Sequence, residues 1–182
     1  MMRHGEPEET GLLLGATDMA STVTGIAACI AQADDLDIRA VISSDLARAS
    51  VPAKEIAMRH NVSLRIDPRW RELGFGAWEG AAPASVDADA LHAFWDNPAA
   101  NPPPKGESWT MLKARVAAAL PDVSHGTLVL AHAGSIRAAL CHFLGLSYRQ
   151  SWAIDLRYST LISLKTWTDQ DAPIAQITGL RT

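Results

Sequence analysis

The sequence has few cysteines and no long apolar run. Its 182 residues include only two cysteines. Cys29 and Cys141 stand in separate segments typical of helices, so neither a disulfide framework nor a Cys-x-x-Cys motif is present. No run approaches the ~20 apolar residues that a membrane span requires, and the start lacks the apolar stretch of a signal peptide. We therefore expect two buried free thiols, no membrane partner and a cytoplasmic location.

The sequence also lacks a large excess of positive or negative charge. Sixteen Lys and Arg oppose 20 Asp and Glu, a formal net charge of −4, while 48% of the residues are hydrophobic. A chain of this length and composition can bury a hydrophobic core, which excludes global disorder. The mild acidic balance disfavours a nucleic-acid partner bound through a basic face. A few arginines can still hold a single phosphate group.

Short apolar runs alternate with segments of helical periodicity. Strands are predicted at 38–43, 62–66 and 126–131, and helices at 47–60, 112–120 and 135–144, with late strands around a turn within 152–167. This alternation predicts an α/β fold, a three-layer α/β/α sandwich with a mostly parallel central sheet.

One domain over residues 1–182 is expected, because the chain contains neither a repeat nor a linker. The proline-rich stretch 98–106 predicts a surface loop, and it falls within an insertion around 81–105 that we expect to act as a lid. Only Met1 and Met2 precede Arg3. We therefore expect a first strand that is nearly absent, or a natural start further upstream.

Four stretches carry residues suited to phosphate chemistry, at 3–7, 43–49, 71–80 and 130–137. Two of them join a predicted strand to a predicted helix and contain Arg48 and His132. Sites in open α/β sheets form at the carboxyl ends of strands, where helix N-termini favour anions. The four stretches are therefore expected to meet around a phosphate group.

The residue types predict a phosphoryl-transfer site. Arg3 and Arg48 can bind phosphate oxygens bidentately. A neutral His4 can attack phosphorus and form a phosphohistidine that water hydrolyses, while Glu72 can protonate the leaving oxygen. Neither a metal ion nor another cofactor is required if the two arginines and His132 neutralise the phosphate charge.

In this order the motifs resemble the histidine phosphatase superfamily, which has a phosphoglycerate mutase-like fold. They are Arg3-His4-Gly5-Glu6, Ser43-Ser44-x-Leu46-x-Arg48-Ala49, Glu72-Leu73-x-x-Gly76-x-Trp78-Glu79-Gly80, Gly106-Glu107-Ser108 and a late His132 before a helix. The resemblance covers the chain from Arg3 to about Leu164.

The resemblance implies a role for each matching residue. His4 is then the nucleophile, Arg3, Arg48 and His132 form the phosphate pocket, and Glu72 is the general acid and later the base. The Gly106-Glu107-Ser108 motif is then expected to open a helix near the pocket, with a role that is either structural or supports the pocket residues. Many relatives carry an asparagine at the position of Thr10, whose hydroxyl is expected to donate one hydrogen bond to the phosphate.

The loop after Glu72 is similar to that of the phosphatase branch, including α-ribazole phosphatases. We therefore expect a metal-independent phosphatase acting on small phosphate monoesters, with the particular substrate left open. One alternative is a phosphotransferase similar to the cofactor-dependent phosphoglycerate mutases, and another is a non-catalytic phosphate-binding protein. A homodimer also stays open, and no role is assigned to Glu79.

Overall fold

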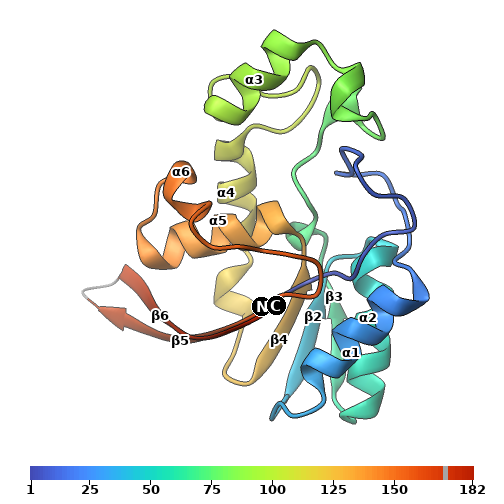
Figure 1. Ribbon diagram of the computed structural model, residues 1–182. Helices are drawn as coiled ribbons and strands as arrows, with labels where there is room; N and C mark the ends of the chain where they lie inside the picture. Colours follow the sequence, from blue (N-terminus) through green and yellow to red (C-terminus); the bar gives the residue numbers. More distant parts are fainter. Residues whose placement is uncertain (170–171) are drawn as a thin grey trace.

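The computed structural model describes residues 1–169 and 172–182 (Figure 1). The strands are β1 (Met2–Arg3), β2 (Ala40–Ser43), β3 (Ser63–Ile66), β4 (Thr127–Ala131), β5 (Leu161–Asp169) and β6 (Ala172–Arg181). The α-helices are α1 (Val23–Ala33), α2 (Ala47–Arg59), α3 (Ala88–Asp96), α4 (Trp109–Ala117), α5 (Ala133–Leu144) and α6 (Tyr148–Ser151). Short 3-10 helices are η1 (Pro68–Trp70), η2 (Gly76–Trp78), η3 (Pro83–Ser85) and η4 (Leu120–Asp122).

The strands form one sheet in the order β3-β2-β4-β1-β5-β6. Strands β1, β2, β3 and β4 pair with one another in parallel. Ser43 of β2 and Met2 of β1 are both in register with Leu130 of β4. Strand β5 is antiparallel to both β1 and β6. The prediction of a mostly parallel central sheet is confirmed, and β1 is as short as expected.

Helices cover both faces of this sheet (Figure 1). Helices α1 and α2 pack on one face around Cys29 and Ile56, and α4 and α5 pack on the other around Leu112 and Leu140. Both cysteines are buried and free, which confirms that prediction. The three layers are therefore helix, sheet and helix.

Local signals place most elements to within a few residues. Helix α5 ends where predicted, because Gly145 adopts a left-handed conformation with φ 66°. The stretch 98–106 is irregular, as expected. The strand prediction was wrong for residues 152–160. Those residues form turns and irregular backbone between α6, which ends at Ser151, and β5, which begins only at Leu161.

The insertion at 81–105 contains η3 and α3 and stands beyond the carboxyl ends of β2 and β4 (Figure 1). Phe94 of α3 anchors it by packing edge-on against Phe75 and Trp78, with ring centroids 5.9 and 5.8 Å apart. Its predicted action as a lid stays a prediction. Within the described ranges, no helix is long and apolar enough to cross a membrane.

Candidate active site

The carboxyl ends of three neighbouring strands bring the predicted histidines together. His4 follows β1, His132 follows β4 and Ser44 follows β2. The backbone N–H of His4 donates to the Ala131 carbonyl at 2.9 Å, and that of Ser44 donates to the Leu130 carbonyl at 3.1 Å. The two imidazole rings lie 5.0 Å apart between centroids. The parallel sheet therefore juxtaposes two residues that are far apart in sequence.

His4 is held as a neutral imidazole with one nitrogen available. Its Nδ1 lies 2.7 Å from the Gly5 carbonyl oxygen. Because a carbonyl oxygen only accepts, Nδ1 carries the hydrogen and Nε2 keeps its lone pair. Burial, followed by the charges of Arg3 and Arg48, lowers the pKa of His4 well below 6.5. This is the form of histidine that attacks an electrophilic phosphorus.

Arg48 is buried and its guanidinium is held from several directions. Nε donates to Nδ1 of His132 at 3.2 Å, Nη1 to the Thr17 carbonyl at 2.7 Å, and Nη2 to the carbonyls of Leu14 and Gly15 at 3.0 and 2.8 Å. A guanidinium has five N–H groups and stays charged in proteins. These contacts leave one N–H on Nη1 for a ligand.

His132 is fully buried and also neutral. Its Nδ1 accepts from Arg48, so Nε2 carries the hydrogen and donates to Oγ of Ser44 at 2.9 Å. Burial, then the charges of His4 and the two arginines, lowers the pKa of His132 well below 6.5. Both ring nitrogens therefore contact protein groups, and the ring orients Arg48. The predicted contact of His132 with phosphate stays a prediction.

Arg3 stacks on an aromatic ring that sequence reasoning did not single out. Its guanidinium carbon lies 4.0 Å from the ring centroid of Tyr158, whose ring is 5.6 Å from that of His4. Nη1 donates to the Leu156 carbonyl at 2.6 Å. Nε is buried and has no hydrogen-bond partner within 1–169 and 172–182. A buried donor without a partner is suited to an anionic ligand.

Glu72 lies against the first turn of α5. One carboxylate oxygen accepts from the Leu73 N–H at 2.8 Å and the other from the Gly134 N–H at 3.0 Å. A Cβ at Gly134 would overlap this carboxylate, so the close approach requires glycine. Burial lowers the pKa values of Arg3 and Arg48, and the charge of Glu72 opposes that shift in both. The Glu72 carboxylate is therefore close enough to interact electrostatically with both arginines.

A partly buried arginine, Arg115, fixes the segment that carries Glu72. Arg115 donates to the carbonyls of Arg69, Arg71 and Glu72 at 2.8, 3.1 and 3.2 Å. It also pairs bidentately with Glu107, with N···O distances of 3.0 and 2.6 Å. The structural role expected for the Gly-Glu-Ser motif is supported by these contacts.

Thr10 is an exposed residue. It sits on an exposed stretch beside Gly11, and among the described residues no hydrogen bond connects its side chain to the other predicted site residues. The predicted contact of Thr10 with phosphate stays a prediction. The structure brings together Arg3, His4, Arg48, Glu72 and His132, the other residues predicted from the motifs.

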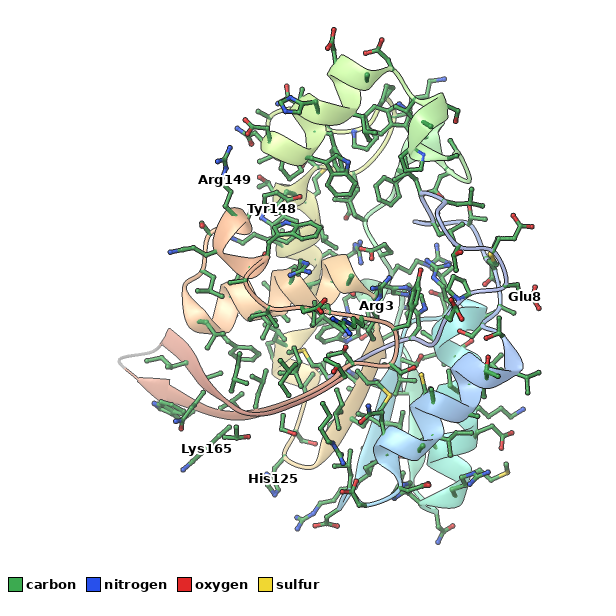
Figure 2. The ribbon with its side chains drawn as sticks, in the orientation of Figure 1. Arg3, Glu8, His125, Tyr148, Arg149 and Lys165 are labelled. Atoms are coloured by element: carbon green, nitrogen blue, oxygen red, sulfur yellow. The ribbon has the colours of Figure 1, made fainter. Side chains whose placement is uncertain are left out.

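The charges around His4 suit an anion. Figure 2 shows Arg3 in the middle of the molecule, far from His125, which precedes the other end of β4. Two arginines flank His4 and raise the local positive charge. Within the described part of the chain, no three His, Cys, Asp or Glu side chains gather in a way that could hold a metal ion. The arrangement presents guanidinium N–H groups of the kind that bind anions such as a phosphoryl group.

The fold is an α/β sandwich, and two histidines and two arginines meet at the carboxyl ends of its parallel strands. Residues 1–177 match the family model of the histidine phosphatase superfamily (branch 1), and the chain belongs to this superfamily. The resemblance inferred from the motifs is confirmed.

Individual relatives include both phosphatases and a mutase by name. A glucosyl-3-phosphoglycerate phosphatase of Mycobacterium tuberculosis is 34% identical over 122 residues, which cover 63% of this chain and 55% of that protein. A probable phosphoglycerate mutase GpmB of Yersinia pestis is 31% identical over 176 residues, covering 88% and 81%. The α-ribazole phosphatase structure from Shigella flexneri has a TM-score of 0.81 at 22% identity, covers 97% and 93%, and shows the shared fold.

Proposed function

We propose that this protein hydrolyses small phosphate monoesters, without a metal ion, through a phosphohistidine formed on His4. The main support for this proposal is the state of His4. The hydrogen bond from Nδ1 of His4 to the Gly5 carbonyl leaves Nε2 unprotonated, and Arg3 and Arg48 stand close enough to lower the pKa of His4. A nucleophile and the cations that neutralise its target therefore share one site.

In the first step, the lone pair of His4 Nε2 attacks phosphorus and the bond to the leaving oxygen breaks. Glu72, in its acid form, gives its proton to that oxygen, so that an alcohol departs. The guanidinium groups of Arg3 and Arg48 stabilise the charge on the equatorial phosphate oxygens. Cationic side chains thereby do what a metal ion does in other phosphatases.

In the second step, water attacks the phosphorus of the phosphohistidine. The Glu72 carboxylate takes a proton from this water while the nitrogen–phosphorus bond breaks. The products are inorganic phosphate and His4 with its lone pair restored, and Glu72 returns to its acid form. The insertion at 81–105 would close over the substrate as a lid and select among monoesters.

A mutase is the second candidate, favoured by the name of the Yersinia pestis relative. A mutase returns the phosphoryl group to another hydroxyl of a phosphoglycerate, whereas a phosphatase releases it to water. A non-catalytic phosphate-binding protein is disfavoured, since binding alone requires no acid at Glu72.

The test is phosphate release from a panel of small monoesters in EDTA, with wild type beside His4→Ala. Release by the wild type that is lost in His4→Ala supports the proposal. Phosphate release by His4→Ala at the wild-type rate would overturn the mechanism. Movement of phosphate between positions of a phosphoglycerate, without net release, would favour the mutase.

A further inference from the structure

The backbone N–H groups of the loop formed by residues 14–17 donate hydrogen bonds to the half-buried carboxylate of Glu79. Glu79 accepts from the N–H groups of Gly15, Ala16 and Thr17 at 3.1, 2.8 and 3.1 Å, and from the Thr17 hydroxyl at 2.8 Å. Successive N–H groups directed at one anion form a backbone nest. The N–H side of the 14–17 loop is therefore fixed by Glu79.

The carbonyl side of the same loop is directed at the phosphate site. Three carbonyls from residues 14–17 accept from the two terminal nitrogens of Arg48, at 2.7 to 3.0 Å. The remaining nitrogen of Arg48 orients His132. The loop thus connects a carboxylate that is not part of the proposed chemistry to a guanidinium that is.

We propose that Glu79 is a positioning residue for the phosphate site. By holding the N–H groups of the 14–17 loop, it keeps the loop carbonyls in place, and these aim the last free N–H of Arg48 at the ligand. The consequence is a loss of phosphate affinity when Glu79 is neutralised. The statement that Arg48 binds phosphate rests on the proposed function. The geometry of the loop is independent of it.

Two further observations support this assignment. A Cβ at Gly15 would overlap both the Glu79 carboxylate and the Leu73 carbonyl, so the loop approaches as closely as glycine allows. Burial alone would raise the pKa of Glu79, but hydrogen bonds from Ala16, Phe75 and Thr17 hold it below its ordinary value. An ionised carboxylate is the form that a nest of N–H donors requires.

The test measures binding of vanadate and of inorganic phosphate by titration calorimetry, in wild type and Glu79→Gln. We expect Glu79→Gln to bind both anions at least about tenfold more weakly, the scale of one charge-assisted hydrogen bond. Glu8→Gln is the matched control. It makes the same chemical change at an exposed residue that precedes the 14–17 loop and lies well away from Arg3 (Figure 2). Its affinities should equal those of wild type.

A double-mutant cycle shows whether Glu79 acts through Arg48. Arg48→Lys alone should weaken vanadate binding, and Glu79→Gln should add little in that background, because residues in one network are not additive. Additive losses would overturn the proposal, as would wild-type affinity in Glu79→Gln. If Glu79→Gln lost activity only on substrates with poor leaving groups, Glu79 would act through the proposed acid Glu72. That result would also overturn the proposal.

A second pair of variants covers the case in which Glu79→Gln does not fold. Thr17→Val removes one hydroxyl bond to Glu79, whereas Thr17→Ser keeps it. Weaker vanadate binding by the valine variant than by the serine variant supports the proposal, and equal affinities overturn it. These titrations need no turnover. If wild type binds neither anion, the proposed function fails, whereas equal binding by wild type and Glu79→Gln removes only the role of Glu79.

Discussion

Nε of Arg48 donates to Nδ1 of His132 at 3.2 Å, and this single bond determines the tautomer of the histidine. Because Arg48 can only donate, His132 must present an unprotonated Nδ1 and carry its hydrogen on Nε2. That hydrogen goes to Oγ of Ser44 at 2.9 Å. The Arg48 cation of the proposed phosphate site is thereby supported by a neutral, fully buried chain of hydrogen bonds, which cannot take up a proton without breaking.

The first prediction concerns Ser44→Ala. Oγ of Ser44 accepts from His132 and from the Leu46 N–H, so alanine leaves buried donors unsatisfied. Each such donor costs about 1–3 kcal/mol in the free energy of unfolding. Urea denaturation should show this loss. Ser43→Ala is the control, because Ser43 is equally buried but only donates one hydrogen bond, to the Ser44 carbonyl. Equal stability of the two variants would contradict the prediction.

The second prediction concerns Glu72→Gln, which removes the proposed acid but keeps an acceptor beside Gly134. Turnover of an alkyl phosphate should fall by roughly 10²–10⁴-fold, the range typical of general acid catalysis. Turnover of p-nitrophenyl phosphate should fall much less, since nitrophenolate leaves without a proton. Steady-state rates for the two substrates provide the measurement, and equal losses would show that Glu72 is not the acid.

The third prediction separates activity from stability at Gly134. Alanine there would overlap the Glu72 carboxylate and displace it, so activity on alkyl phosphates should fall as it does in Glu72→Gln. Alanine also favours a helix over glycine by about 0.5–1 kcal/mol, and Gly134 lies within α5. Thermal unfolding should therefore show an unchanged or higher midpoint for Gly134→Ala. Full activity in this variant would contradict the assigned position of Glu72.

The fourth prediction concerns pH. Burial is the main reason that the pKa values of His4 and His132 fall well below 6.5. Near and below about pH 6.5, the ordinary value for an unfolded histidine, the unfolded chain therefore binds more protons than the folded protein. The free energy of unfolding should rise with pH across this window and fall on acidification.

Urea denaturation at about pH 5, 6.5 and 8 measures this slope. The slope should be small between about pH 7.5 and 8, since an unfolded histidine titrates near pH 6.5. A free energy of unfolding that is flat from about pH 5 to 7.5 would contradict the prediction.

Part of this protein could be predicted from local sequence alone. The apolar runs before Ser43 and His132 indicate strands, and Gly145 marks the end of a helix, because each signal acts over a few neighbouring residues. The order of the strand-to-helix turns then places Arg48 and His132 at one edge of a parallel sheet. Residue types suited to phosphate chemistry are visible in the same motifs.

Tertiary structure decided what supports those residues. Tyr158 under Arg3, Arg115 against the Glu72 segment and the nest around Glu79 all depend on contacts between distant parts of the chain. Many of the partner groups are backbone carbonyls and N–H groups, which every residue carries and no motif distinguishes. The irregular segment 152–160 is likewise held by a distant side chain, since Arg137 donates to the Ile154 carbonyl at 3.0 Å. Sequence determined which groups can do the chemistry, and packing determined their protonation and direction, because burial and long-range hydrogen bonds exist only in the folded chain.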